Sequence, residues 1–262
     1  MASPAADGDL WIRRFHHAPG SAIRLVCLPH AGGSASYYFS MSQELAPGIE
    51  VLAVQYPGRQ DRRREPLIGN AADLADQISA ALVPIAGQPF AFFGHSMGAI
   101  LAFEVAQRLR TQLGVSPQRL FVSGRRAPSR ARKGNVHQRD DAGLLAELNR
   151  LGGTDKRLLN DPEMLPAILA VSRNDYKVAE TYAWVPGEPL ACPVTALMGS
   201  ADPQATVEEA EAWREHTTGP FDLRVFPGGH FYLDQARAEV LKAIVAGLAG
   251  VVHAGPREGI SS

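Results

Sequence analysis

The chain has 262 residues, of which 45% are hydrophobic and 20% charged, and its formal net charge is −1. This composition fits one large folded domain and excludes a disordered or fibrous chain. The net charge excludes a bulk electrostatic field that would attract nucleic acid or an anionic membrane, so we expect neither as a partner.

No targeting or membrane segment is recognisable in the sequence. The N-terminal segment MASPAADGDLWIRRF lacks an apolar core of signal-peptide length, and no run of about 18 apolar residues follows it. We therefore expect a cytoplasmic protein. The two cysteines, Cys27 and Cys192, are too few for a Cys-rich zinc site, and we expect both to be reduced packing residues.

Short apolar runs that end at Gly or Pro alternate with helical patterns along the chain. The expected strands are residues 23–29, 51–57, 89–94, 119–124, 193–199 and 222–229. The expected helices are residues 71–86, 97–113, 206–217 and 236–252. This alternation predicts an α/β fold with a mostly parallel central sheet flanked by helices.

Residues 126–189 interrupt the alternation with three helix-like segments and no strand. Leucines recur at helical spacing in residues 140–152, and the segment 161–182 offers Asp161 as an N-cap and Pro162 at the first helical position. We expect residues 126–189 to form a helical lid over a core made of residues 1–125 and 190–252, and residues 253–262 to form a disordered tail.

The expected lid suggests a role in substrate access. It begins directly after a strand whose end should face the site described below, where it could exclude water and contact a substrate. We expect Met164 and Ile168 to line the substrate pocket. The alternative is a purely structural cap, in which the apolar residues only pack on the core.

The segment FFGHSMGAI (92–100) contains one serine between two glycines, after an expected strand and before an expected helix. In that context Gly94-His95-Ser96-Met97-Gly98 is typical of a nucleophile elbow. The glycines let strand and helix approach closely, and the amides at the helix N-terminus favour negative charge. Ser96 is therefore the candidate nucleophile, and we interpret the adjacent His95 as structural.

A serine hydroxyl needs a general base and a carboxylate that orients the base. Where a nucleophile elbow is used, the chain order is Ser, then Asp or Glu, then His. Asp202 follows the expected strand 193–199 and His230 follows the expected strand 222–229, so both fall at the carboxyl edge of the sheet. We predict a Ser96–His230–Asp202 triad; the alternative for Asp202 is a turn residue before Pro203.

The Gly-rich loop PHAGGSAS (29–36) follows the first expected strand. A loop of this kind can direct a backbone N–H at a developing oxyanion, and we predict an oxyanion hole made by the N–H groups of Ala31 and Met97. A plain turn is the alternative. The loop lacks the spacing of a phosphate-binding loop, and the predicted chemistry requires neither a metal nor a bound cofactor.

Nearly the whole chain resembles the free-standing type II thioesterases that accompany modular polyketide and nonribosomal peptide synthases in antibiotic biosynthesis. The resemblance is carried, in chain order, by LPHAGGSA, VQYPGRQDR, FFGHSMGA, LFVSGRRAP, LNRLGGTDKRLLNDPEML, RNDYKVAETY, CPVTALMGSADP and FPGGHFYL. It implies an α/β-hydrolase that edits by removing stalled or aberrant acyl groups from the phosphopantetheine arm of acyl or peptidyl carrier proteins. The family's triad falls on Ser96, Asp202 and His230, and an acyl-enzyme intermediate is implied.

Other functions stay open at this point. A chain-releasing thioesterase or a general esterase of the same fold would use the same triad, whereas a non-enzymatic carrier-protein binder would not need one. The chain starts and stops around one domain, which favours the free-standing editing form.

Two basic clusters suggest a docking rim. The carrier proteins of the resembled systems are acidic, so we expect Arg62, Arg63, Arg126 and Arg130 to contact them. The alternative for these arginines is a solvated or internally paired surface.

Overall fold

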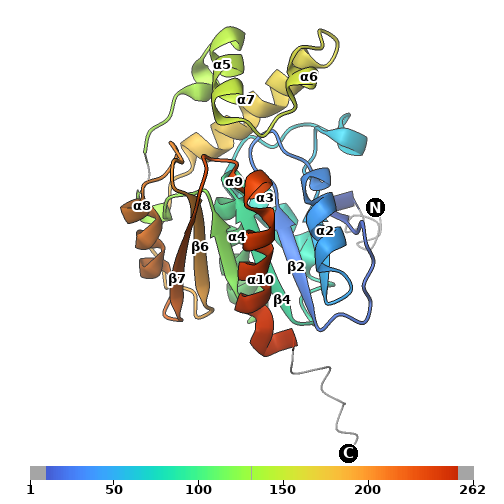
Figure 1. Cartoon of the computed structure of the whole chain (residues 1–262), viewed down its shortest axis with the longest axis vertical. Coiled ribbons are helices and arrows are strands. Elements are labelled where there is room, and N and C mark those ends of the chain that lie inside the picture. Colours follow the sequence, from blue (N-terminus) through green and yellow to red (C-terminus); the bar gives the residue numbers. More distant parts are fainter. Residues whose placement is uncertain (1–9, 131, 253–262) are drawn as a thin grey trace, which may run out of the picture.

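A computed structural model describes residues 10–130 and 132–252. Its centre is a seven-stranded sheet in the order β1-β3-β2-β4-β5-β6-β7 (Figure 1). The strands are β1 (Ile12–Arg13), β2 (Ile23–Leu28), β3 (Ile49–Val54), β4 (Phe90–His95), β5 (Leu120–Ser123), β6 (Val194–Gly199) and β7 (Phe221–Phe226). Only β1, which pairs with β3, runs antiparallel among these seven strands of the described residues. The predicted α/β class and its mostly parallel sheet are confirmed.

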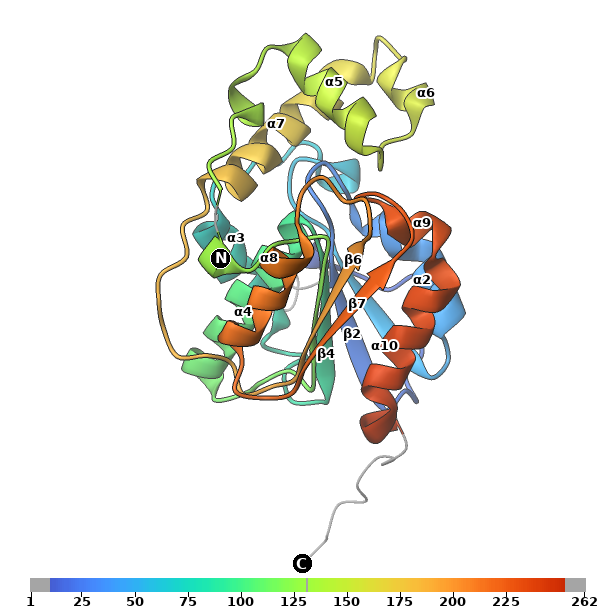
Figure 2. The ribbon, with the colours of Figure 1, turned by 60° about the vertical axis from the view of Figure 1, so that its left-hand side comes forward.

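Helices cover both faces of the sheet (Figure 2). They are α2 (Phe39–Leu45), α3 (Ala71–Leu82), α4 (Met97–Leu113), α5 (Asp141–Leu151), α6 (Lys156–Leu159), α7 (Leu165–Thr181), α8 (Val207–Glu211), α9 (Tyr232–Gln235) and α10 (Arg237–Val252). One hydrophobic cluster buries α3 and α4 against the sheet, and a second buries α2 and α10 against the opposite face. The sheet is therefore buried on both sides, as its continuous apolar strands require.

Most element bounds lie within a few residues of those expected, and the differences have local causes. The helix expected at residues 71–86 ends at Leu82, because Pro84 has no backbone N–H with which to continue the helical hydrogen bonds. The helix expected at residues 206–217 divides into α8 and a 3₁₀ helix, Ala212–His216. The short edge strand β1 and helix α2 were not predicted.

Helices α5, α6 and α7 form a separate layer above the carboxyl edge of the sheet (Figures 1 and 2). We call residues 126–189 the helical insertion. Its own small core is made by buried apolar residues: Val136, Leu144, Leu148, Leu159 and Leu169. The tail expected at residues 253–262 lies outside the described residues.

The expected start of the last helix in the insertion was wrong. Helix α7 begins at Leu165, with Pro166 in its first turn, where the missing proline N–H costs no helical hydrogen bond. Asp161 instead accepts hydrogen bonds from the N–H groups of Glu163 and Met164, at 2.9 and 3.3 Å. Asp161 therefore closes a turn that precedes the helix.

Within the described part of the chain, no helix is both long enough and apolar enough to cross a membrane. The two cysteines, Cys27 and Cys192, are buried and unbridged, as expected. Burial raises the pKa of both thiols, to about 11 for Cys192, which is consistent with inert packing residues.

The turn from β4 to α4 is tightly packed against the neighbouring backbone. A Cβ atom at Gly94 would lie 2.1 Å from the carbonyl oxygen of Gly98, and a Cβ atom at Gly98 would lie 2.0 Å from that of Leu28. Both obstacles are backbone atoms, which cannot rotate away. Ser96 at the centre of the turn has φ 56° and ψ −113°, a strained conformation for a residue with a side chain.

We predict that Gly98→Ala lowers the free energy of unfolding by about 3 kcal/mol, because the added methyl group collides with the backbone of β2. Gly250→Ala in α10 is the matched control, since a Cβ there meets nothing within 4 Å. This control should stabilise the protein by about 0.5–1 kcal/mol through helix propensity. Urea unfolding measures both, and an unchanged midpoint for Gly98→Ala would show that the turn can relax.

Candidate active site

Ser96 occupies the sharp turn between β4 and α4, as the sequence pattern predicts. The strained backbone of this turn leaves Ser96 partly accessible, whereas its neighbours His95 and Met97 are fully buried. Because Ser96 immediately precedes α4, the amides of the first helical turn lie beside it. The local structure therefore presents one hydroxyl next to the positive end of a helix dipole.

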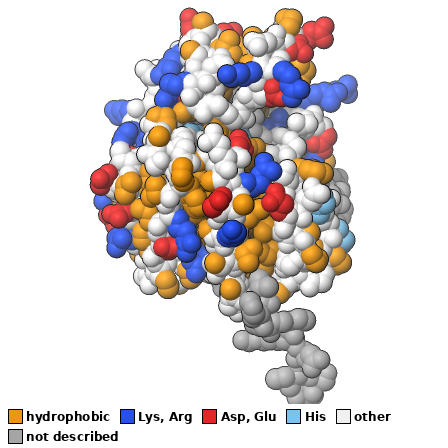
Figure 3. Space-filling view, viewed as in Figure 1, with side chains coloured by type: hydrophobic (Ala, Val, Ile, Leu, Met, Phe, Trp, Pro, Cys, Tyr) orange, Lys and Arg blue, Asp and Glu red, His pale blue; other side chains and the backbone are white. Residues whose placement is uncertain are grey.

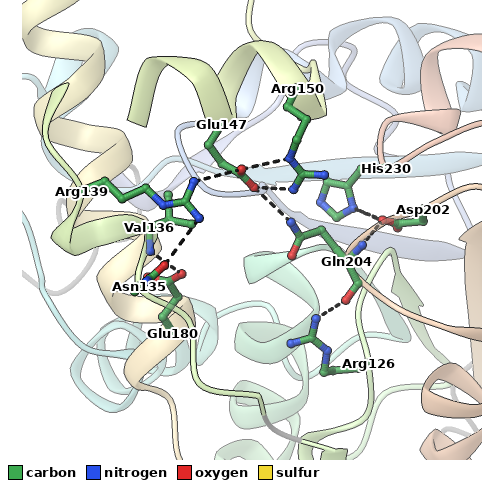
Figure 4. A network of polar contacts seen from close by, with 10 residues as sticks. All are labelled: Arg126, Asn135, Val136, Arg139, Glu147, Arg150, Glu180, Asp202, Gln204 and His230. Atoms are coloured by element: carbon green, nitrogen blue, oxygen red, sulfur yellow. Dashed lines mark hydrogen bonds and ion pairs between the residues drawn. The ribbon is translucent and has the colours of Figure 1, made fainter. Parts of the chain in front are cut away.

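His230 and Asp202 lie together at the ends of adjacent strands. Asp202 follows β6 and His230 follows β7, and His230 Nδ1 lies 3.0 and 2.9 Å from the two carboxylate oxygens of Asp202 (Figure 4). The side chain of Asp202 is 0% exposed and that of His230 is 3% exposed. The carboxylate also accepts the backbone N–H of Gln204 at 2.8 Å. This arrangement fixes the imidazole and leaves its Nε2 as the nitrogen available for proton transfer.

Ser96, His230 and Ala31 line one cavity of about 540 Å³. The structure thus brings together three of the predicted site residues from three separate strand ends. Asp202 is not among the described residues that line this cavity and is connected to it through its contact with His230.

The loop at residues 29–36 lies beside the serine turn, as predicted. A Cβ atom at Gly98, in the first turn of α4, would lie 2.8 Å from the carbonyl oxygen of Pro29, so loop and helix are in close contact. Among the described residues, the N–H groups of Ala31 and Met97 have no hydrogen-bond acceptor. Two unpaired amides therefore flank the cavity next to Ser96.

The expected pocket residues of the insertion were wrong. Met164 is 45% exposed at the start of α7, and Ile168 packs against the insertion's own small core. Neither residue occurs among the described residues that line the cavity. The insertion does cover the cavity, but through other positions: Leu148, Leu151, Tyr176 and Ala179.

Two of the four arginines expected on a docking rim are buried. The Arg62 side chain is 5% exposed, pairs with Glu65 and lies over the Trp11 ring, so the expectation of a partner contact was wrong for Arg62. Arg126 is 9% exposed and lies in the cavity wall, where it donates a hydrogen bond to the carbonyl of Gln204 (Figure 4). It belongs to the cavity and not to an outer rim.

The other two arginines of the expected rim are accessible. Arg63 is exposed, and Arg130 is exposed and ion-paired with Glu215. Only this pair can still contribute to an outer docking surface.

The helical insertion also contacts the loop that carries Asp202. Glu147 of α5 is buried and accepts hydrogen bonds from Arg150 at 2.6 Å and from Arg139 and the Gln204 side chain at 3.4 Å each (Figure 4). Gln204 in turn bonds Asp202 through its backbone N–H. The sequence analysis missed Glu147 and Gln204, because their link depends on how the insertion packs over the sheet.

Two further histidines surround His230. The His95 ring lies 4.9 Å from the His230 ring, and the His30 ring lies 5.9 Å from that of His95. Burial, followed by the charges of His230 and Arg59, lowers the pKa of His30 to about 3, and burial likewise lowers the pKa of His95 well below its usual value. Among the described residues, His30 Nδ1 and His95 Nε2 have no hydrogen-bond partner, so a proton there would create an uncompensated buried charge.

His30 and His95 are therefore uncharged side chains near His230, the proposed base. His95 fits the structural interpretation made from the sequence, because its Nδ1 lies 2.9 Å from the Ser123 hydroxyl, which contacts the Tyr232 hydroxyl. His30 was missed, although its place within the predicted oxyanion loop (29–36), directly before Ala31, was a signal. Among the described residues, no three His, Cys, Asp or Glu side chains form a group that could hold a metal ion.

A family model described as a thioesterase domain matches residues 23–248. The chain belongs to this thioesterase family. It is 55% identical over 239 residues to thioesterase PikA5 of Streptomyces venezuelae, an alignment that covers 91% of this chain and 85% of that protein. The predicted hydrolase class is confirmed by this membership.

Solved structures of thioesterases have the same fold. The type II thioesterase BorB from the borrelidin biosynthetic cluster is 49% identical, with a TM-score of 0.86 and coverage of 92% of this chain and 98% of that chain. YbtT, a type II thioesterase from the yersiniabactin NRPS/PKS pathway, is 31% identical, with a TM-score of 0.81 and coverage of 92% and 99%. The predicted resemblance to type II thioesterases and the predicted α/β-hydrolase fold are confirmed.

We predict that this thioesterase loses stability as the pH falls from about 6.5 towards 4. Burial lowers the folded-state pKa of His30 to about 3 and of His216 to about 4, and lowers that of His95, while unfolded histidines titrate near 6.5. Between pH 6.5 and 4 the unfolded state therefore binds protons that the folded state does not bind. The free energy of unfolding has its full value above about pH 6.5. Below that pH it falls by about 1.4 kcal/mol per pH unit for each such histidine.

Urea unfolding at pH 7.5, 6, 5 and 4.5 measures this slope. His216→Gln, which replaces a buried histidine remote from the serine turn, should make the slope shallower by the contribution of one proton. A free energy of unfolding that stays constant between pH 6.5 and 5 in the wild-type protein would contradict the neutral state assigned to these histidines.

Proposed function

We propose that this protein is an editing thioesterase that hydrolyses acyl groups from the phosphopantetheine arm of acyl or peptidyl carrier proteins through a Ser96–His230–Asp202 triad. The observation that carries the proposal is the buried His230–Asp202 pair, whose His230 lines one cavity with the strained Ser96 in a chain of the thioesterase family. The names of its relatives support the substrate class, because BorB and YbtT are described as type II thioesterases of biosynthetic pathways.

In the first half-reaction the Ser96 hydroxyl attacks the thioester carbonyl carbon. The Ser96 proton passes to His230 Nε2, because Nδ1 is held by Asp202. As the carbon–sulfur bond breaks, the departing thiolate takes that proton from His230 and leaves as the carrier's thiol. The acyl group stays bound to Ser96 as an ester.

The second half-reaction uses the same groups with water as the nucleophile. Water gives a proton to His230 and its oxygen bonds to the acyl carbon. The bond to Ser96 then breaks, Ser96 recovers its proton from His230, and a carboxylic acid leaves. In both halves the negative charge on the carbonyl oxygen is stabilised by the N–H groups of Ala31 and Met97. No step needs a metal or a bound cofactor.

The cavity fits a substrate with an apolar acyl end and an anionic arm. Apolar side chains of the insertion, including Leu148 and Leu151, line the cavity together with the basic side chains of Arg126, Arg132 and Lys133. The basic side chains carry the charge that the phosphate of phosphopantetheine requires. We propose that residues 126–189 act as a lid that shapes the acyl pocket through these apolar residues.

The docking surface for the carrier protein is proposed at the exposed arginines Arg63 and Arg130. Basic and acidic side chains are interspersed over the face drawn in Figure 3, so the attraction would be local and not a field of the whole molecule. The cytoplasmic location stays a prediction.

The test compares three butyryl substrates at equal concentration: a butyryl carrier protein, butyryl-pantetheine and p-nitrophenyl butyrate. We expect kcat/KM to be highest for the carrier protein and lowest for the oxygen ester. The double variant Arg63→Glu/Arg130→Glu should lower kcat/KM severalfold on the carrier protein alone, with a larger effect at low salt. The double variant Arg224→Glu/Arg237→Glu, at two exposed arginines that do not line the cavity, is the charge-matched control.

Each alternative function gives a different result. Equal efficiency on the oxygen ester and the thioesters would indicate a general esterase. A cyclised or chain-released product would indicate a releasing thioesterase, and carrier binding without acid formation would indicate a binder. If the arginine variant changed both thioester substrates equally, the proposed docking surface would be wrong.

A further inference from the structure

A buried carboxylate of the helical insertion binds the loop that carries one of the proposed oxyanion amides. Asp175 lies on α7 and is 1% exposed. Its Oδ2 accepts the backbone N–H of Gly32 at 2.8 Å, and Gly32 is the residue directly after Ala31. The insertion therefore reaches the loop through a charge-assisted hydrogen bond to the backbone, one residue from the amide in question.

Arg59 also contacts both Asp175 and the loop. Its guanidinium pairs with both oxygens of Asp175, at 2.6 and 3.0 Å, and also donates to the carbonyl of Gly33 at 3.1 Å. Arg59 is 8% exposed, so this two-pronged ion pair is buried on both sides. The Gly32 N–H and the Gly33 carbonyl are thus fixed by one ion pair.

The surroundings leave the loop little freedom. Gly32 has φ +78°, and a Cβ atom there would lie 2.9 Å from the hydroxyl of Ser172, one turn before Asp175 on α7. Further along, the Ala35 N–H donates to Gln55 at 3.1 Å, and the Pro29 carbonyl accepts the Tyr56 hydroxyl at 3.1 Å. Polar partners thus hold the loop on both sides of Ala31, whose own N–H is left for a ligand.

We propose that Asp175 and Arg59 are positioning residues for the oxyanion hole. They hold the Ala31 N–H at the place where the carbonyl oxygen becomes negative, and because Asp175 belongs to α7, they make that geometry depend on the docked position of the insertion. The inference rests on the proposed hydrolytic function and adds a role for two residues that do not touch the substrate. Burying an ion pair adds little net stability by itself, so its use here is the orientation of the loop.

The test uses Asp175→Asn, which keeps the side-chain size but removes the charge that pairs with Arg59. We expect kcat to fall about 10- to 100-fold while KM stays within about twofold, because the amide matters most in the transition state. An alkyl boronic acid, which forms a tetrahedral adduct with a reactive serine, should lose affinity by a similar factor. An unreactive butyryl-pantetheine amide should bind as it does to the wild-type protein.

Two controls separate positioning from loss of stability. Asp141→Asn removes the exposed pair between Asp141 and Arg173 of α7, which does not contact the loop, and should leave kcat unchanged. Ile78→Ala in α3 creates a cavity in the core and should lower the melting temperature at least as much as Asp175→Asn, again with normal kcat.

A double variant, Arg59→Met/Asp175→Leu, keeps the inference falsifiable if Asp175→Asn does not fold. Removing both charges should restore much of the melting temperature, while kcat stays low because the Gly32 N–H has lost its acceptor. Recovery of kcat together with stability would overturn the inference.

Running every variant on p-nitrophenyl butyrate as well keeps the two proposals apart. The oxyanion forms on any ester, so the positioning effect must appear there even if carrier-bound acyl groups prove not to be the substrate. A normal rate of Asp175→Asn on both substrate types would overturn the inference while leaving the thioesterase proposal intact.

Discussion

The contact between the β4–α4 turn and the end of β2 is the constraint on which the site depends. Gly98 lies so close to the carbonyls of Leu28 and Pro29 that a methyl group cannot fit between them. This contact holds Ser96 in its strained conformation, at a cost of about 1–3 kcal/mol that the surrounding sheet must offset. It also places the loop that follows β2 against the first turn of α4. The same packing therefore positions both the proposed nucleophile and the two proposed oxyanion amides.

The remaining parts of the site are arranged around that contact by the parallel sheet. The ends of β6 and β7 lie on the same edge as the end of β4, so Asp202 and His230 meet beside the cavity without any long connection, and His230 lines it. The insertion then contacts two loops of that edge, through Asp175 to the oxyanion loop and through Glu147 to Gln204 next to Asp202. The docked position of the helical insertion is therefore linked by hydrogen bonds to both loops.

Local patterns were enough to predict the parts of the site that lie at strand ends. The glycines around Ser96, and the positions of Asp202 and His230 just after apolar runs, are signals contained in a few neighbouring residues. Such local signals do not predict which residues of the helical insertion contact the cavity. Met164 and Ile168 have the right apolar character, but which face of a helix meets the cavity depends on the packing of α5, α6 and α7 on one another. The bond from Asp175 to Gly32 spans 143 residues of sequence, and no local pattern reports it.

The central claim is that acyl groups pass through a covalent ester on Ser96, and rapid-quench mass spectrometry tests it most directly. The protein is mixed with butyryl-pantetheine and the reaction is quenched within the first turnover. The protein is then digested, and the mass of the peptide that contains Ser96 is measured. We expect a butyryl group on that peptide in the wild-type protein. In Ser96→Ala we expect no such modification and a rate of acid formation no higher than about a hundredth of the wild-type rate. Acid formation by Ser96→Ala at a rate near that of the wild type, or a butyryl group on another residue, would contradict it.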